Sequence, residues 1–249
     1  ELSVYRESIT ATIDPESVVA PDGACTKRML TIAAEHRRFA FGIAVPVGAR
    51  QPGGRLIGLA VHVVVGLGNP GPRYSNTRHN IGFLVADALV QDNKWITSNH
   101  AETARVTLAD EEVLVVKPQT YMNRSGESVQ ALSEEVGFTA EDVLVVYDDF
   151  LFDFGRLRLR RSGSDGGHNG LASVLECLQT EQIARLRLGI GPVPANVADV
   201  DFVLAPFADA DDVAGLTERG SAATNCWLQE GIEAAMGRFN GCSSINPLA

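Results

Sequence analysis

Hydrophobic residues become regularly spaced from residue 61 onward, and their period changes repeatedly along the chain. A stripe through residues 81–89 falls on one helix face, with Asn80 placed to cap that helix. Residues 156–161 alternate charged and apolar side chains, as a half-exposed strand does, so their arginines are expected to share one face. The expected strands cover residues 61–65, 103–108, 112–117, 143–147, 156–161 and 186–190, and the expected helices cover residues 81–89, 129–136, 171–178 and 211–236. This alternation predicts an α/β fold, in which helices flank a twisted mixed β-sheet in a single globular domain.

Residues 1–60 lack this regularity. Prolines and the Gly53-Gly54 pair interrupt their short apolar runs, which predicts an N-terminal extension of unknown role ahead of a globular domain at 61–249. Residues 27–55 hold six basic side chains against one acidic side chain, which faintly resembles an organelle targeting segment. The acidic residues before them argue against targeting.

Composition excludes several classes of protein. Hydrophobic residues make up 45% of the 249 residues and charged residues 21%, so general disorder and fibrous repeats do not fit. The four cysteines form no CxxC pair, which favours reduced thiols and a cytoplasmic location. The longest uncharged stretch, residues 56–72, is too short and too polar for a spanning helix, so no membrane segment is expected.

The net charge of -10 argues against a protein that coats nucleic acid through bulk positive charge. Four arginines nevertheless gather at positions 156, 158, 160 and 161. This concentration indicates a local basic patch on an otherwise acidic chain.

The sequence GLGNPG at residues 66–71 follows a predicted strand and matches the dinucleotide fingerprint GxGxxG. In that fingerprint a helix opens within the motif and turns its free N–H groups toward a pyrophosphate. Here Pro70 and Pro72 remove two such donors, and the helical stripe starts only at Ile81. We therefore interpret the motif as a tight turn that presents Asn69 at the carboxyl end of a strand.

Polar residues near two other strand ends are candidates for chemistry. His79 precedes the helix at 81–89, and Asp148 and Asp149 follow the strand at 143–147. Asp after a strand commonly makes a turn, and a lone His is commonly a capping residue. If the strands are parallel, however, a carboxylate at this edge of the sheet could orient the histidine ring as a general base.

The glycine-rich segment SGSDGGHNG at residues 162–170 places His168 and Asn169 at a helix start, where Asn169 is a candidate N-cap. Together with Asn69 and Asn123, Asn169 is expected to occupy loops that converge at one end of the sheet. Amide side chains there can hold a peptide-like main chain and stabilise an oxyanion. A metal site remains an alternative, and its ligands would be His79, Asp148, Asp149 and His168. HExxH, GxSxG and P-loop motifs are absent from the sequence.

Five blocks within residues 61–245 carry a more specific signal: VVVGLGNPGPRYSNTRHNIGF, KPQTYMNRSGESV, VLVVYDDF, GGHNGLASV and RLRLGIG. In order and spacing they resemble the bacterial-type peptidyl-tRNA hydrolase family. The resemblance implies a monomeric esterase, with no metal and no cofactor, that cleaves the ester between a peptide and the 3′ ribose of tRNA. Its partner would be peptidyl-tRNA, bound by the acceptor arm and the 3′ end, and residues 61–249 would be the catalytic domain.

The resemblance also implies roles by motif position. His79 matches the catalytic base of the family, and Asp148 matches the carboxylate that orients it. The positions that match substrate-binding residues are Asn69, Tyr74, Met122, Asn123 and Asn169. Arg160 and Arg187 fall where the family holds the 5′ phosphate of tRNA.

Two features depart from the family pattern. After Asp149 the family tends toward an acidic-then-proline turn, whereas this chain has FLFDF at residues 150–154, so the shape and tRNA contacts of that turn are expected to differ. Residues 1–60 have no counterpart in the typical bacterial enzyme. Three other functions stay open: a non-catalytic RNA-binding relative that assists splicing, a dinucleotide-binding oxidoreductase and a metallohydrolase.

Overall fold

The computed structural model describes residues 61–91 and 94–241. The strands are β1 (His62–Gly66), β2 (Ile96–Ser98), β3 (Ala101–Leu108), β4 (Glu111–Pro118), β5 (Val143–Asp153), β6 (Leu157–Arg160) and β7 (Ala184–Gly191). The α-helices are α1 (Ile81–Val90), α2 (Ser125–Val136), α3 (Asn169–Cys177), α4 (Asp199–Leu204) and α5 (Val213–Phe239). Short 3-10 helices, η3 (Arg78–Asn80), η4 (Met122–Arg124) and η5 (Ala140–Asp142), precede α1, α2 and β5.

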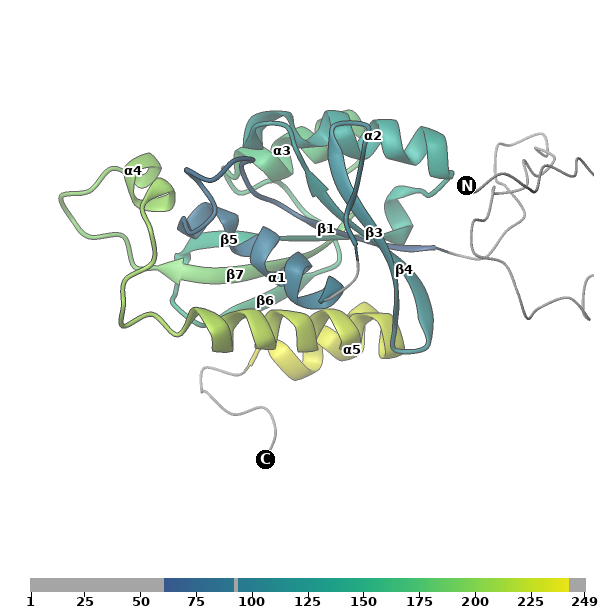
Figure 1. The fold of residues 1–249 in the computed structure, drawn as a ribbon. Coiled ribbons are helices and arrows are strands. Elements are labelled where there is room, and N and C mark those ends of the chain that lie inside the picture. Colours follow the sequence, from purple (N-terminus) through teal and green to yellow (C-terminus); the bar gives the residue numbers. More distant parts are fainter. Residues whose placement is uncertain (1–60, 92–93, 242–249) are drawn as a thin grey trace, which may run out of the picture. The chain divides into compact units, whose positions relative to one another are not determined.

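The seven strands form one mixed sheet in the order β2-β3-β4-β1-β5-β7-β6. Strands β4, β1, β5 and β7 run parallel, while β2, β3 and β6 pair antiparallel toward the two edges. The predicted α/β fold with a mixed sheet is therefore confirmed (Figure 1). Because β1 and β5 are parallel neighbours, the loops that follow their carboxyl ends meet at one edge of the sheet.

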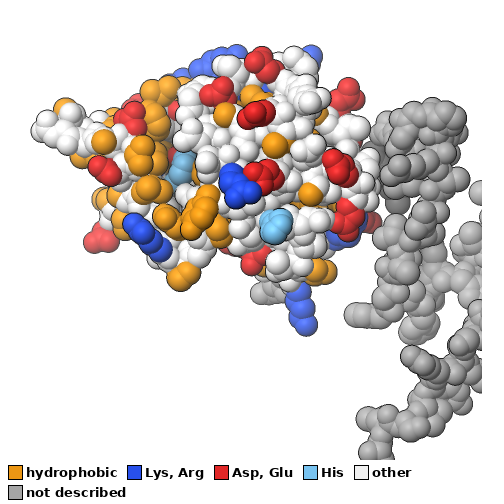
Figure 2. Space-filling view, turned by 90° about the horizontal axis from the view of Figure 1, so that it is seen from above, with side chains coloured by type: hydrophobic (Ala, Val, Ile, Leu, Met, Phe, Trp, Pro, Cys, Tyr) orange, Lys and Arg blue, Asp and Glu red, His pale blue; other side chains and the backbone are white. Residues whose placement is uncertain are grey.

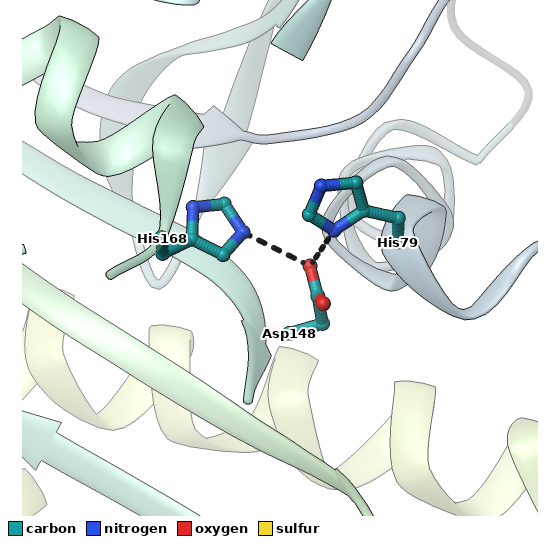
Figure 3. A group of neighbouring side chains, drawn as sticks. All are labelled: His79, Asp148 and His168. Carbon is teal, nitrogen blue, oxygen red and sulfur yellow. Dashed lines mark hydrogen bonds and ion pairs between the residues drawn. The ribbon is translucent and has the colours of Figure 1, made fainter. Parts of the chain in front are cut away.

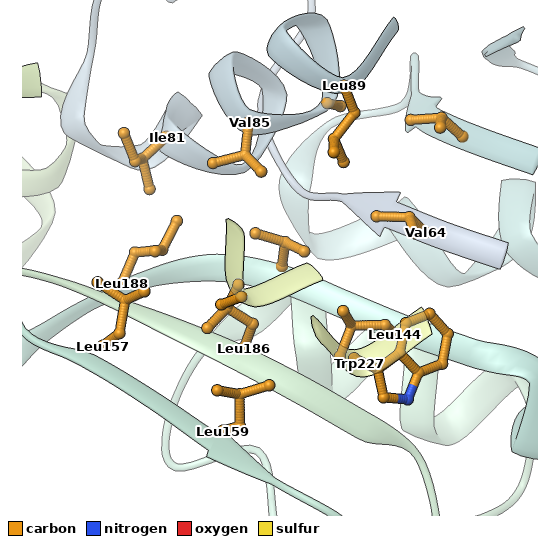
Figure 4. Close-up of a cluster of buried hydrophobic side chains, with 14 of the residues drawn as sticks. Val64, Ile81, Val85, Leu89, Leu144, Leu157, Leu159, Leu186, Leu188 and Trp227 are labelled. Carbon is orange, nitrogen blue, oxygen red and sulfur yellow. The ribbon is translucent and has the colours of Figure 1, made fainter. Parts of the chain in front are cut away.

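Helices cover both faces of the sheet, with α1 and α5 on one face and α2 and α3 on the other (Figure 1). A hydrophobic core lies on each face of the sheet, and alternate residues of the central strands point into one core or the other. Val64 packs with α1 and α5, and Val63 and Val65 pack with α2 and α3. The leucines of β6 and β7 join Trp227 of α5 on the first face (Figure 4). Within the described residues, no helix combines the length and the hydropathy that a membrane span needs.

Most elements agree with the hydrophobic pattern, including α1 on its stripe and α2, which ends at Gly137 in a left-handed conformation (φ 86°). Local predictions at α1 and β5 are wrong. Asn80 occupies the N-cap position of α1, but its side chain does not cap the helix. The strand expected over 143–147 continues as β5 to Asp153, so residues 150–154 begin as strand rather than as a turn. The predicted extension at 1–60 and its targeting segment lie outside the described residues.

Replacing Gly126 by alanine is expected to lower the free energy of unfolding by about 1–3 kcal/mol. A Cβ at this position in α2 would lie 2.1 Å from the carbonyl oxygen of Ser173, so α2 and α3 would have to separate. Urea denaturation followed by circular dichroism measures the change. In the control Gly237→Ala, the new Cβ meets no atom within 4 Å, and the better helix former should leave stability equal or higher. Equal losses in both variants would contradict this account of the α2–α3 contact.

Candidate active site

The edge where β1 and β5 end brings His79 and Asp148 into contact. His79 lies in η3, and Asp148 lies within β5, where the sheet buries it. Nδ1 of His79 lies 2.7 Å from Oδ1 of Asp148. The neighbouring Arg78 fixes this segment, because its guanidinium donates to the carbonyl oxygen of Pro206 (2.6 Å) and lies over the ring of Phe202 (4.5 Å).

A second imidazole shares the same carboxylate oxygen. Nε2 of His168 lies 3.1 Å from Oδ1 of Asp148, so two rings converge on one oxygen (Figure 3). Nδ1 of His168 accepts a hydrogen bond from the backbone N–H of Leu171 (3.2 Å) and so caps α3. The N-cap is thus His168, and the predicted cap Asn169 is the first residue of the helix.

These partners determine the tautomers of both rings. Because Nδ1 of His168 accepts an N–H group, its proton must sit on Nε2, which donates to Asp148. An ionised carboxylate only accepts, so Nδ1 of His79 also carries a proton. In the neutral ring the lone pair of His79 is therefore on Nε2, which Figure 3 shows turned away from Asp148. That lone pair can take a proton from water.

Asp148 stays ionised even though it is buried. Burial by itself raises the pKa of the Asp148 carboxyl, but the charge that His79 and His168 carry when protonated, together with their hydrogen bonds, outweighs burial and holds that pKa well below its usual range. The carboxylate can therefore orient His79 and stabilise the imidazolium that forms when His79 takes a proton.

The same three side chains are also candidate ligands for a metal ion. One ligand atom from each of His79, Asp148 and His168 lies within 4.8 Å of the others, a spacing that suits an ion. A metal on Nε2 of His168 would need the lone pair at that nitrogen, and the proton would then have to sit on Nδ1, where Leu171 already donates. The fourth predicted ligand, Asp149, pairs with Arg187 instead. The geometry fits a hydrogen-bonded His–Asp–His group better than a metal centre.

A cleft of about 250 Å³ opens beside these side chains. His79, Asp148, His168 and Asn169 line its polar side. Phe150 and Leu151 of β5, with Val200 and Val203 of α4, line its apolar side. A cleft lined by both polar groups and apolar side chains suits an acyl group with a hydrophobic side chain.

Tyr147 lies beneath the cleft, and its ring centroid is 4.7 Å from that of His168. Burial raises the pKa of Tyr147 to about 12, against the opposing charges of Arg187 and Arg185. Since the raised pKa favours the neutral phenol in the folded state, its contribution to stability is complete below pH 10 and is lost between pH 10 and about 12.

Between pH 9 and pH 11.5, Tyr147→Phe is therefore expected to remove about 2 kcal/mol of the alkaline loss in the free energy of unfolding. Urea denaturation of both proteins at pH 9 and pH 11.5 measures the difference. Parallel alkaline slopes for the two proteins would show that Tyr147 is not responsible.

The turn after β1 presents Asn69, as expected from the sequence. The amide of Asn80 exchanges two hydrogen bonds with the backbone N–H and carbonyl of Asn69, both 2.9 Å long, and Oδ1 of Asn69 accepts from the N–H of Met122 (2.9 Å). A Cβ on Gly66 would lie 2.3 Å from the carbonyl oxygen of Gly82, so this glycine lets α1 pack against the turn. The glycine motif therefore serves packing and the position of Asn69.

The other predicted substrate-binding residues lie on adjoining segments. Met122 is buried in η4, and a Cβ on Gly170 would lie 2.4 Å from its sulfur, so the η4 segment reaches the start of α3 beside Asn169. Asn123 follows Met122 and is exposed. Tyr74 is half-buried on the β1–η3 loop, with the guanidinium of Arg73 5.5 Å from its ring centroid. The three asparagine-bearing loops thus lie at one end of the sheet, and Asn169 lines the cleft itself.

The predicted phosphate-binding arginines lie on two neighbouring strands, Arg160 on the edge strand β6 and Arg187 on β7. Arg158 and Arg160 of β6 pair with Arg187 and Arg185 of β7, respectively, while Leu157 and Leu159 are buried. Arg158 and Arg160 therefore share one face of β6, as predicted, whereas Arg156 and Arg161 lie outside the strand. Arg160 is exposed, whereas Arg187 forms an ion pair with Asp149.

Arg185 holds part of the site in place, although the sequence analysis assigned it no function. Its side chain is buried, and its guanidinium donates to the carbonyl oxygens of Gly163 (2.6 Å), Ser164 (2.9 Å), Glu181 and Ile183 (both 3.0 Å). These bonds fix the glycine-rich segment that carries His168. An arginine between two apolar strand residues was the available signal, since buried arginines need many acceptors.

The protein has an α/β sheet, with a cleft at the ends of its parallel strands. A buried carboxylate there orients a histidine. These features are typical of an enzyme that uses general base catalysis. A family model described as Peptidyl-tRNA hydrolase matches residues 63–247. The chain belongs to the peptidyl-tRNA hydrolase family.

Similar proteins support this assignment over most of the described chain. A peptidyl-tRNA hydrolase of Thermotoga sp. (strain RQ2) is 44% identical over 180 residues, which cover 72% of this chain and 96% of the relative. One from Rhodopirellula baltica is 44% identical over 186 residues, covering 73% and 98%. The crystal structure of peptidyl-tRNA hydrolase from Acinetobacter baumannii matches with a TM-score of 0.64 at 31% identity, covering 73% of this chain and 95% of that chain.

Proposed function

We propose that this protein hydrolyses the ester bond between a peptide and the 3′ ribose of tRNA, with His79 as the general base. Membership of the peptidyl-tRNA hydrolase family gives the activity and the substrate, and the site supplies a chemical route. The observation that carries the route is the 2.7 Å hydrogen bond from Nδ1 of His79 to Asp148, which leaves Nε2 free to act.

The reaction needs two proton transfers. Nε2 of His79 takes a proton from water as the water oxygen bonds to the ester carbonyl carbon, and Asp148 stabilises the imidazolium. As the tetrahedral intermediate collapses, the bond to the 3′ oxygen breaks and the imidazolium returns the proton to that oxygen. Asn169, which lines the same cleft as His79, donates to the oxyanion in this proposal. The products are a free peptide and a tRNA with a 3′ hydroxyl.

The remaining residues bind the substrate. Asn69, Tyr74, Met122 and Asn123, on the loops after β1 and β4, hold the peptide and the 3′ end, while Arg160 and Arg187 hold the 5′ phosphate. Arginine forks suit phosphate oxygens, so binding should weaken as salt rises. We further propose a cytoplasmic monomer in which residues 61–249 are the catalytic domain and residues 1–60 an extension. Cys177 and Cys226, both free, suit a reducing compartment.

An assay with N-acetylated aminoacyl-tRNA and free aminoacyl-tRNA, each with and without EDTA, tests this function. We expect selective release of the N-blocked amino acid at an unchanged rate in the chelator. RNA binding without release of either amino acid would identify a binding protein instead. Loss of activity in EDTA, restored by added metal, would identify a metallohydrolase.

A further inference from the structure

Phe152 collects three guanidinium groups around one aromatic ring. The ring centroid lies 4.6 Å from Arg187, 5.0 Å from Arg156 and 5.6 Å from Arg158. We call these four residues the Phe152 cluster. Each contact is within the range of a cation–π interaction.

The cluster follows from the unexpected length of β5. Strand β5 continues beyond Asp149 with a shift of register against β7, and this extension carries Phe152. Arg158 stands directly opposite Arg187 in the β6–β7 pair, so their side chains emerge on one face of the sheet. The segment at 150–154, which departs from the family pattern, therefore becomes the platform under these arginines.

The cluster carries more positive charge than its protein partners neutralise. Arg187 pairs with Asp149, but within residues 61–91 and 94–241 Arg156 and Arg158 form no ion pair. Partial burial and then the charges of Arg160, Arg187 and Arg156 lower the pKa of Arg158. Like charges on opposite positions of paired strands destabilise a sheet. Stability of the fold therefore does not explain the cluster, whereas an anionic ligand does.

The chemistry of the cluster selects a phosphate. Planar guanidiniums match phosphate oxygens with two parallel hydrogen bonds, and a ring beneath them restricts their rotation before the ligand arrives. Figure 2 shows acidic, basic and apolar side chains interspersed on the face that carries α2 and α3, so broad attraction from that face is weak. An acidic protein with one concentrated arginine group is expected to contact a polyanion at that group.

We propose that Phe152 positions Arg156 and Arg158 as a second phosphate site, which binds a backbone phosphate of the acceptor stem in addition to the 5′ phosphate held by Arg160 and Arg187. This inference rests on the proposed function, because it takes tRNA as the polyanion. Phe152 is a positioning residue, and the two arginines contact the RNA.

Binding of a short acceptor-stem RNA duplex with a CCA end, made with and without a 5′ phosphate, tests the second site. Equilibrium affinity is measured between 50 and 200 mM KCl. Each lost phosphate contact lowers the slope of log K against log salt by about 0.9, or weakens binding about 5- to 10-fold near 0.1 M. We expect Arg158→Gln to show this loss with both duplexes, because the second site does not hold the 5′ phosphate.

Matched variants separate the parts of the cluster. Phe152→Ala is expected to lower the slope as Arg158→Gln does, and Phe152→Tyr, which keeps the ring, to retain it. Arg105→Gln removes the same charge from β3, near the opposite edge of the sheet, and should leave the slope unchanged.

Three outcomes would overturn the second site: an unchanged slope in Arg158→Gln, an equal loss in Arg105→Gln, or a loss seen only when the 5′ phosphate is present. Failure of the proposed function gives a different result. In that case the wild type does not hydrolyse N-acetylated aminoacyl-tRNA, although the effect of Arg158→Gln on RNA binding remains.

Discussion

Replacing His79 by asparagine is expected to lower kcat for N-acetylated aminoacyl-tRNA by about 10²- to 10⁴-fold, the contribution of a positioned general base. An amide nitrogen can still donate to Asp148, but it has no lone pair that takes a proton from water at neutral pH. KM is expected to change little, because the asparagine and arginine contacts to the substrate remain. Single-turnover kinetics with saturating enzyme measures the chemical step directly.

His100→Asn is the matched control. His100 is exposed in the turn between β2 and β3 and lies outside the cleft, so the same substitution there should leave kcat unchanged. Circular dichroism of His79→Asn should match that of the wild type. Full activity in His79→Asn would refute its assignment as the base.

Asp148→Asn is expected to cost about 10²- to 10⁴-fold in kcat through a different route. The amide oxygen can still accept from His79 and His168, because both rings bond to the same oxygen of Asp148, but the negative charge that stabilises the imidazolium of His79 is lost. Each of the two hydrogen bonds also changes from a charged to a neutral acceptor, which destabilises the fold by about 1 kcal/mol per bond.

Kinetics and urea denaturation of Asp148→Asn measure both effects. Asp153→Asn supplies the control, because Asp153 is exposed at the end of the same strand. Retention of wild-type kcat in Asp148→Asn, with lowered stability alone, would mean that Asp148 is structural and does not orient the base.

The central strands and long helices could be predicted because their buried residues recur along the chain with the period of a strand or a helix. Val63, Val64 and Val65 form an uninterrupted apolar run, and the stripe at 81–89 is the buried face of α1. Alternation at 156–161 likewise predicted strand β6 and the common face of Arg158 and Arg160. These features depend on local sequence and could be found without the structure.

The errors arise where tertiary partners override local preference. Asp148 and Asp149 resemble a turn in sequence, yet they lie inside β5, because two imidazoles satisfy the first and Arg187 with the N–H of Leu151 satisfies the second. Asn80 was predicted as a cap but holds Asn69 instead. The six-residue helix α4 offers too short a stripe for a period to be recognised.

The candidate site likewise contains residues that could be predicted from the sequence and residues that could not. The sequence blocks identified His79 and Asp148 as partners, and the structure shows their contact. Periodicity held no signal for Phe152 as a platform, because the cluster depends on the register shift between β5 and β7. The assignment of roles to the asparagines and to Arg160 stays a prediction.

The tautomer of His79 tests the central claim most directly. A long-range ¹H–¹⁵N correlation spectrum of protein labelled with ¹⁵N-histidine distinguishes a proton on Nδ1 from one on Nε2, and the spectrum of His79→Asn assigns the signals. The account requires the neutral ring of His79 to carry its proton on Nδ1. A neutral His79 protonated on Nε2 in the wild type would contradict the account, since that nitrogen could not accept a proton from water.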